Sequence, residues 1–473
     1  MTIAASGARQ EVGKASLAAI AFWGLIIIVA LAPFPLGSNR PGPWSALAIG
    51  VGLVLVGWAA AVLRDPRRVS LPWTLHWPAT AGFALVLAWL YLQTVPWTPA
   101  AWHNPLWRET ASVLGQPLGG AISLSPSDGV TAMMRLITYG AVFWLAMNFG
   151  ISRRRAAIAL WSVVVAGTIY AAYGIAVEFA GNQTILWYQK WAYFDSMTAT
   201  FVNRNNFASY TGMALLIAVA LLSQKLRDTR QEGEESLAET LDRIVRTGGL
   251  LFVAILLLAS AVLLSHSRGG LFALVPGIAV LAYGSTRRAD GARTGRHVLF
   301  GIVLVLLCLV AIGGSATLGR LEIADGPLSI DGRILIFDSA IRGIRAAPLT
   351  GYGYGTFESV FDLWRSDFVS FGRIDKAHNT YLEFAVEAGI PAFLCMLAIL
   401  AWIAAKCFGG MISRRRDAIY PMVATAVTAQ QGTHALVDFN LQIPAIAAAY
   451  CLVLGVGFAQ CWRTREVDPL RPG

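Results

Sequence analysis

Apolar runs about as long as a bilayer is thick recur along almost the whole chain. A helix crosses a hydrocarbon core of about 30 Å with about 20 apolar residues, and about twelve runs fit that measure. They lie near 17–35, 44–63, 77–94, 130–150, 156–180, 206–223, 248–265, 270–284, 297–318, 384–407, 419–437 and 443–461. Of the 473 residues, 56% are hydrophobic and 14% charged, which excludes a soluble enzyme, a disordered chain and a disulfide-stapled fold. The sequence predicts an all-α integral membrane protein.

Basic clusters alternate with loops that hold few basic residues. One set of loops holds Arg64 to Arg68, Arg153 to Arg155, Lys225 to Arg246, Arg287 to Arg296, Arg414 to Arg416 and Arg463 to Arg465. Because basic residues resist transfer across the membrane, both termini are predicted to be cytoplasmic, with the first run an uncleaved signal-anchor. The net charge of +10 then follows from the basic residues of the cytoplasmic loops, which also attract anionic lipid headgroups. It does not indicate a nucleic-acid partner.

Three polar segments on the opposite, outer side are too long for simple turns. They cover about 95–129, 181–205 and 319–383, and we expect them to form a cap of short helices over the bundle. The chain then divides into N-terminal spans (1–200), a membrane domain (201–461) that includes the outer loop 319–383, and a cytoplasmic tail (462–473).

Polar residues suited to chemistry collect in five patches on that outer side. The first, Asn203-Arg204-Asn205, opens the sixth run, where it suits an anion or a sugar or simply caps the helix. The second is Ser265-His-Ser-Arg-Gly-Gly270. Its Arg268 stands at membrane depth, where a guanidinium either grips a phosphate or extends to the interface.

The other three patches follow further along the chain. Asp331-Gly-Arg333 precedes a glycine-tyrosine run, whose Tyr352 and Tyr354 are expected to expose rings for carbohydrate stacking. His378 and Asn379 lie where the outer segment enters the tenth run, and this histidine either moves a proton or caps a helix. His434 and Asp438 are four residues apart and share a face if helical, as a supporting pair or a spare acid and base.

Several catalytic signatures are missing from the sequence. There is no Asp-x-Asp pair, HExxH motif, Cys/His cluster or GxSxG elbow, and the five cysteines lie singly near apolar runs. We therefore expect neither a metal nor another cofactor.

Four motifs match a known family. SHSRGG, DGR, PLTGYGYGTF and AHNTYLEFAVEAG, in this order on a protein of many spans, resemble the O-antigen ligase and Wzy-type polymerase superfamily of bacterial envelope glycosyltransferases. The resemblance covers about 200–445. It implies a GT-C-like fold in the bacterial inner membrane that uses a polyprenyl-diphosphate-linked glycan as donor at the periplasmic face, without metal. It also implies Arg268, Arg333 and His378 as the functional set.

The family contains two activities. Ligases pass the glycan to lipid A-core, whereas polymerases pass it to another lipid-linked repeat unit, and TFVNRNNFA and HALVDFNLQIP are more similar to polymerases. We therefore expect surface polysaccharide or O-antigen polymerisation, with ligation as the alternative. A flippase for lipid-linked sugars is the alternative of another class. Partners are the lipid-linked donor, a glycan or lipid A-core acceptor, the bilayer and, as a further candidate, a chain-length regulator protein.

The chemistry assigns a role to each group. Fixed cations stabilise the charge that develops on a departing diphosphate, which fits Arg268 and Arg333 with help from Arg204. His378 is the expected base for the acceptor hydroxyl, in a single displacement that inverts the anomeric centre. Alternatively His378 orients the acceptor, and His434, Asp438, Glu383 or Glu387 is the base. The expected substrate contacts are Arg204, Asn203, Asn205, Asn379, Tyr352, Tyr354, His434 and Asp438.

Overall fold

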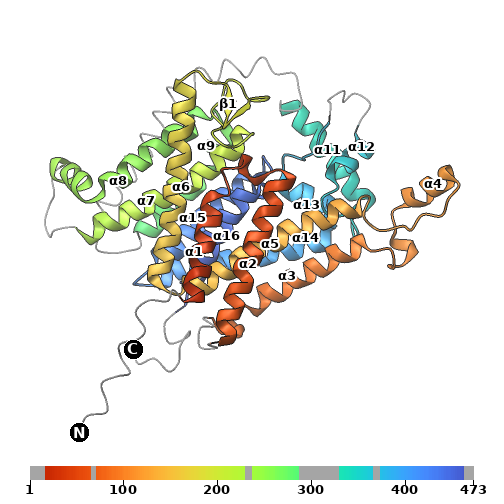
Figure 1. The fold of residues 1–473 in the computed structure, drawn as a ribbon, viewed down its shortest axis with the longest axis horizontal. Coiled ribbons are helices and arrows are strands. Elements are labelled where there is room, and N and C mark those ends of the chain that lie inside the picture. The colour runs from red at the N-terminus through yellow and green to blue at the C-terminus, as the bar shows by residue number, and fades with distance from the viewer. Residues whose placement is uncertain (1–15, 65–70, 230–236, 287–329, 366–372, 463–473) are drawn as a thin grey trace, which may run out of the picture.

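The computed structural model describes residues 16–64, 71–229, 237–286, 330–365 and 373–462, and most of them are helical. A helix coincides with every predicted run except 297–318, which lies outside the described residues. These helices are α1 (Leu17–Leu31), α2 (Pro41–Arg64), α3 (Trp73–Thr94), α5 (Pro126–Gly150), α6 (Arg153–Phe179), α7 (Arg204–Asp228), α8 (Leu237–Leu264), α9 (Arg268–Thr286), α14 (Ile390–Ser413), α15 (Ile419–His434) and α16 (Pro444–Ala459) (Figure 1).

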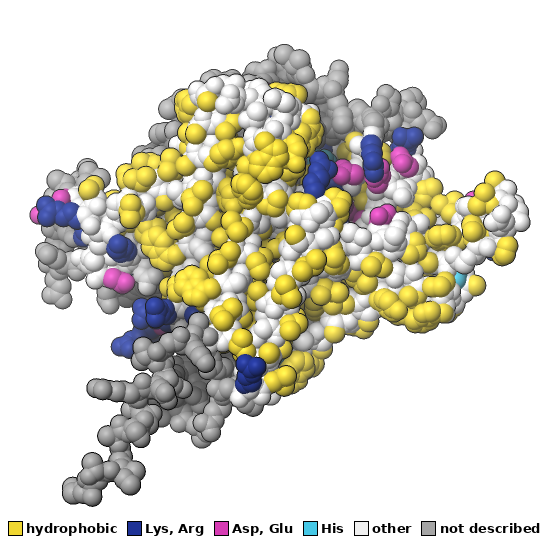
Figure 2. All heavy atoms as spheres, viewed as in Figure 1, with side chains coloured by type: hydrophobic (Ala, Val, Ile, Leu, Met, Phe, Trp, Pro, Cys, Tyr) yellow, Lys and Arg dark blue, Asp and Glu magenta, His cyan; other side chains and the backbone are white. Residues whose placement is uncertain are grey.

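The helices are long and apolar in the way a membrane bundle requires. Among the described residues, eight helices are long and apolar enough to cross a bilayer, and α1 and α16 are shorter apolar helices. Hydrophobic side chains are spread over the whole face seen in Figure 2, and a mixed group of acidic and basic side chains gathers near α11 and α12. A mostly helical membrane protein is therefore confirmed, while the count of about twelve spans stays a prediction.

Helix α7 lies at the centre of the bundle. The whole of its apolar stretch is buried, and α6, α8, α9 and α15 pack around it. Two glutamines of α15, Gln430 and Gln431, form hydrogen bonds with α7. Ser209 of α7 donates to Gln431 Oε1 at 2.9 Å, and Gln430 Nε2 donates to the carbonyl of Ser209 at 3.2 Å. Polar groups buried among helices are satisfied by each other, as a water-free core demands.

The predicted run 384–407 is divided in two. Helix α13 (Thr380–Ala388) ends before Gly389, and α14 begins at Ile390. Gly389 has a φ of 82°, and a Cβ there would lie 2.3 Å from the carbonyl oxygen of Leu349, so only glycine fits this close crossing. The candidate span therefore starts later than the apolar pattern indicates, and Glu383 and Glu387 lie outside it.

The outer segments contain short elements. The first holds the 3-10 turn η3 (Ala100–Trp102) and α4 (Pro105–Leu114), and the third holds α11 (Ile330–Ala346) and α12 (Phe357–Trp364). The second forms a small antiparallel hairpin of β1 (Thr184–Ile185) and β2 (Tyr188–Gln189), where short helices were expected. The turns η1 (Leu36–Ser38) and η4 (Asn440–Gln442) precede α2 and α16.

The cap has a small core of its own. Ile336 of α11, Val360 of α12 and Val386 of α13 are fully buried together. In Figure 1, α11 and α12 lie side by side at one margin of the bundle, and α4 projects from it. The described part of 319–383 is thus an ordered layer that holds α13 in place.

Candidate active site

His378 lies in the turn that leads into α13. Its backbone has a φ of 51°, a left-handed conformation that non-glycine residues rarely adopt. The residues on both sides hold it there. The N–H of Ala377 donates to Glu383 Oε2 at 2.8 Å, and Asn379 Oδ1 caps α13 by accepting from the N–H groups of Tyr381 and Leu382. Strain maintained in this way is typical of functional positions.

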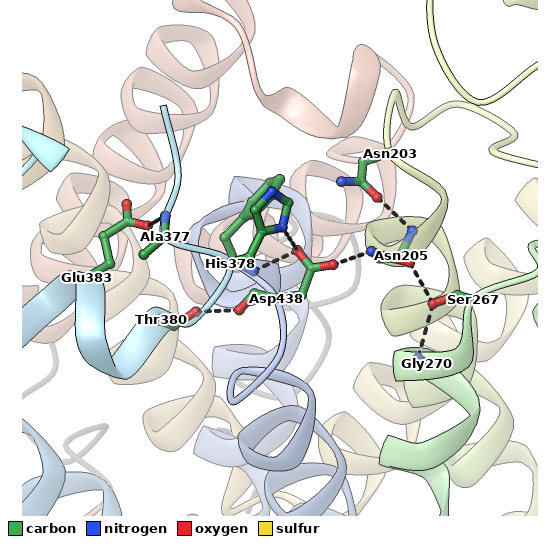
Figure 3. Close-up of polar contacts among 10 residues, drawn as sticks. Asn203, Asn205, Ser267, Gly270, Ala377, His378, Thr380, Glu383 and Asp438 are labelled. Atoms are coloured by element: carbon green, nitrogen blue, oxygen red, sulfur yellow. Dashed lines mark hydrogen bonds and ion pairs between the residues drawn. The ribbon is translucent and has the colours of Figure 1, made fainter. Parts of the chain in front are cut away.

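A buried carboxylate faces the His378 ring. Nδ1 of His378 lies 3.7 Å from Oδ1 of Asp438, which is 1% exposed (Figure 3). The N–H of Phe439 donates to the same oxygen at 2.7 Å. Burial raises the pKa of Asp438, but His378, His434 and the N–H of Phe439 together hold that pKa below its usual value. An ionised carboxylate beside Nδ1 orients the ring and leaves Nε2 as the nitrogen that meets a substrate.

A chain of hydrogen bonds connects Asp438 to the start of α9. The side-chain amide of Asn205 donates to Asp438 Oδ2, and Ser267 Oγ donates to Asn205 Oδ1 at 2.8 Å. The N–H of Gly270 in turn donates to Ser267 Oγ at 3.0 Å. Asn203 caps α7 by accepting from the N–H of Asn205 at 2.7 Å. Figure 3 shows Asp438 between His378 and Asn205, so three sequence-distant patches meet here.

One of the three predicted arginines contacts a tyrosine ring, and a second acts on the same ring through its charge. The guanidinium of Arg204 lies 5.5 Å from the ring centroid of Tyr193, and its Nη1 donates to Ser196 Oγ at 3.0 Å. Burial, together with the charge of Asp438, raises the pKa of Tyr193 to about 12 against the opposing charges of Arg204 and Arg333. Arg333, in the first turns of α11, therefore lies within electrostatic reach of the same place as Asp438.

The third arginine begins α9. Arg268 follows Ser267 directly, so the hydrogen-bonded chain from Asp438 ends beside it, and its side chain is exposed. An arginine at a helix N-terminus, where the helix dipole favours negative charge, is suited to a phosphate. His434 is fully buried next to Gly269, and neither ring nitrogen has a hydrogen-bond partner among the described residues.

The two tyrosines of the glycine-rich run differ from expectation. Tyr352 is buried and its hydroxyl accepts from Trp364 Nε1 at 3.0 Å, so the predicted exposed ring is wrong for this residue. The cause is the turn itself, because Gly353 places its backbone against Ser123. Tyr354 packs edge-on against Phe384, with the ring centroids 5.4 Å apart.

Sequence reasoning missed some members of this region. It gave no role to Ser267, although this residue adjoins Arg268, or to Ser196, Lys376 and Arg135. Arg135 could have been found from a simple signal, since it is a charge inside the predicted run 130–150. Among the described residues, no group of three or more His, Cys, Asp or Glu is placed to hold a metal ion.

Part of the chain matches a known protein family. Residues 253–397 match the family model described as O-Antigen ligase. The matched segment contains Arg268, Arg333 and His378, while Asn205 and Asp438 lie outside it. No curated protein matched the chain. The resemblance to the O-antigen ligase and Wzy-type polymerase superfamily is thereby confirmed.

Proposed function

We propose, from the O-antigen ligase segment at residues 253–397, that the protein is a metal-independent inverting glycosyltransferase for surface polysaccharide or O-antigen polymerisation. Its donor is a polyprenyl-diphosphate-linked glycan at the periplasmic face of the inner membrane, in a GT-C-like fold with both termini cytoplasmic. The observation that carries the proposal is the position of His378 beside Asp438, from which hydrogen bonds continue through Asn205 and Ser267 to the start of α9. This arrangement connects a group that takes a proton to a group that binds phosphate.

The reaction is a single displacement. The acceptor hydroxyl oxygen attacks the anomeric carbon, and its proton passes to Nε2 of His378. The bond from the anomeric carbon to the diphosphate oxygen breaks, and its electron pair leaves with the diphosphate. Attack opposite the leaving group inverts the anomeric centre. Asp438 stabilises the imidazolium that forms, as a buried carboxylate next to a histidine does in other acid-base sites.

The arginines act on the leaving group. Arg268 at the start of α9 binds the departing diphosphate, with Arg333 and Arg204 supplying further positive charge beside Tyr193. Their positions are fixed before the reaction, so they stabilise the charge that develops in the transition state more than that of the ground state. Removing one such group costs about 10²–10³ in rate, and removing a general base costs about 10²–10⁴.

The other candidate bases fit less well. Glu383 accepts from the N–H of Ala377 and from Lys376, and Glu387 accepts from the N–H of Phe357 at 2.9 Å. Both carboxylates are therefore used to hold the cap. His434 has no access to solvent, and Asp438 is already paired with His378 and Asn205.

Two alternatives remain to be separated by experiment. One is ligation to lipid A-core, which needs the same donor chemistry with a different acceptor. The other is a flippase for lipid-linked sugars. A flippase needs ionisable groups exposed alternately to both sides, whereas the groups described above gather at one end of α7, α9 and α13.

The deciding experiment is the glycan profile of a deletion strain carrying variant copies of the gene. A polymerase predicts loss of long chains while a single repeat on lipid A-core persists. Accumulated full-length lipid-linked chains would instead indicate a ligase, and single repeats retained on the cytoplasmic leaflet a flippase. Arg268→Ala, Arg333→Ala and His378→Ala should each abolish long chains at normal membrane levels. The matched control is Arg345→Ala, because Arg345 is an exposed arginine in the last turn of α11, the helix that also contains Arg333.

A further inference from the structure

A long apolar cavity lies beside the candidate site. It has a volume of about 280 Å³, and its walls come from α3, α5, α14 and α16. Along α5 the lining extends from Ala132 to Met147, fifteen residues later in the helix, and this is about 22 Å at the rise of an α-helix. One leaflet of a bilayer core is about 15 Å deep. The cavity is thus longer than one leaflet is thick.

One end of the cavity carries charged side chains. Arg135 of α5, Lys376, Glu383 and Glu387 line it there, together with Tyr354. The guanidinium of Arg135 lies 4.8 Å from the ring centroid of Trp44, and its buried Nε has no hydrogen-bond partner among the described residues. A charged group held at this depth is costly unless it has a task.

The balance of charge at this end is positive. Lys376 Nζ is paired with Glu383 Oε1 at 3.2 Å, so these two charges cancel. Burial and then the charge of Glu383 raise the pKa of Glu387 to about 8, against the opposing charge of Lys376, so Glu387 is mostly neutral at pH 7. Arg135 is left as the uncompensated charge, and a nearby anion would complete the cluster.

The cavity adjoins the candidate site through α13. Thr380 lines the cavity, and its hydroxyl donates to the carbonyl oxygen of Asp438 at 3.1 Å. The start of α9, where the donor diphosphate is proposed to bind, lies on the other side of Asp438, beyond Asn205 (Figure 3). A ligand in the cavity would therefore approach His378 from the side opposite the donor.

We infer that this cavity binds the lipid chain of the acceptor, a second polyprenyl-linked glycan, with its phosphate at Arg135 and its single hydrocarbon chain between α3, α5, α14 and α16. The inference rests on the proposed polymerase function and deepens it. An ordinary phospholipid chain ends near the middle of the bilayer, so a chain longer than one leaflet fits the length of the cavity better.

Direct photocrosslinking tests the inference without depending on activity. The probe is an eleven-isoprene polyprenyl diphosphate with a diazirine at the far end of its chain, added to the full chain in vesicles of phosphatidylethanolamine and phosphatidylglycerol. We expect labelling of deep lining residues such as Met147 and Phe458. Labelling confined to other surfaces, or displacement of the probe by added phosphatidylglycerol, would overturn the inference and leave the proposed transferase intact.

A kinetic test uses one matched pair of variants on α14. Leu400→Trp fills the cavity, while Leu394→Trp changes a side chain that is exposed and does not line it. With acceptors on two-isoprene and eleven-isoprene tails, the wild type should favour the long tail by about tenfold or more in KM, as the burial of only about two methylene groups would give. Leu400→Trp should remove that preference and keep kcat on the short tail, and Leu394→Trp should retain it.

The remaining outcomes of the kinetic test are also decisive. A Leu400→Trp protein that still prefers the long tail would show that the cavity does not bind the acceptor chain. A wild-type protein equally active on both tails would show the same. If the wild type transferred the glycan to no acceptor, the result would instead count against the proposed function. The crosslinking result would still decide whether a polyprenyl chain occupies the cavity.

Discussion

Asp438 is the residue on which the proposed chemistry depends most, because it contacts groups from three parts of the chain. Its carboxylate faces the ring of His378 and accepts hydrogen bonds from the side-chain amide of Asn205 and from the backbone N–H of Phe439. A neutral amide at this position would keep the shape of the site and remove the charge that orients the imidazole.

Asp438→Asn should therefore lower the transfer rate by about 10²–10⁴, the usual contribution of an acid-base group, with little change in donor KM. Purified protein with lipid-linked donor and acceptor gives the measurement. Asp417→Asn is the control, since Asp417 pairs with Arg153 at the other end of the bundle. A rate within about twofold of wild type for Asp438→Asn would remove the Asp438–His378 pair from the mechanism.

Glu387 makes a separate prediction about pH. Its pKa is raised from 4.5 to about 8, first by burial and then by Glu383, so the folded protein retains a proton that the unfolded chain loses. Stability should therefore fall as the pH rises from about 4.5 to about 8. Glu387→Gln keeps a neutral side chain throughout and should flatten this part of the profile.

Thermal unfolding in detergent at pH 5 and pH 8 provides the comparison, with an expected fall in Tm of about 5 °C for the wild type across this range. The control is Glu358→Gln, because Glu358 lies at the surface in contact with Arg373 and should leave the wild-type slope unchanged. An identical slope in Glu387→Gln would show that another group causes the pH dependence.

At the scale of elements, the break between α13 and α14 sets the position of the histidine. Gly389→Ala would push a methyl group into the carbonyl oxygen of Leu349 at a φ of 82°. We expect reduced thermal stability and loss of activity, because α13 would shift relative to the loop before it. Gly409→Ala on α14 has open space around its Cβ position and should be tolerated. Wild-type stability of Gly389→Ala would contradict the tight crossing.

The apolar pattern predicted these elements only in part. It located the helices, because a bilayer imposes one length on every span, but it could not find the break at Gly389 inside a continuous apolar run. Likewise, it could not explain why Gln430 and Gln431 lie inside an apolar run, since their partner Ser209 lies far away in sequence. Periodicity reports local burial and contains no information about which helix supplies the partner.

The candidate site, too, could be predicted from the sequence only in part. Arg268, Arg333 and His378 were predicted from their motifs, whereas the pairing of His378 with Asp438 joins residues from two separate segments and required the fold. Tyr352 was misjudged because a glycine-rich turn looks exposed in sequence, yet this one is packed against Ser123 and α13. Motifs identify chemical groups, and tertiary contacts decide which of them meet.

At the scale of the whole molecule, the distribution of basic residues predicts which side each loop faces. In a variant without its five natural cysteines, Arg268→Cys should react with a membrane-impermeant maleimide added to intact spheroplasts, because Arg268 is exposed on the predicted outer side. Arg416→Cys, in a basic loop, should react only after the membrane is opened. The reverse pattern would place the candidate site in the cytoplasm.

The complete enclosure of α7 has a consequence for how the protein is made. Its neighbours α8, α9 and α15 are all synthesised after it, so for a time this helix stands in the membrane with Ser209 facing lipid instead of Gln431. A hydroxyl without its partner is poorly suited to hydrocarbon. Biogenesis therefore favours an insertase that shelters the nascent helix until translation supplies its companions, and truncation after α7 should yield a product that quality-control proteases remove.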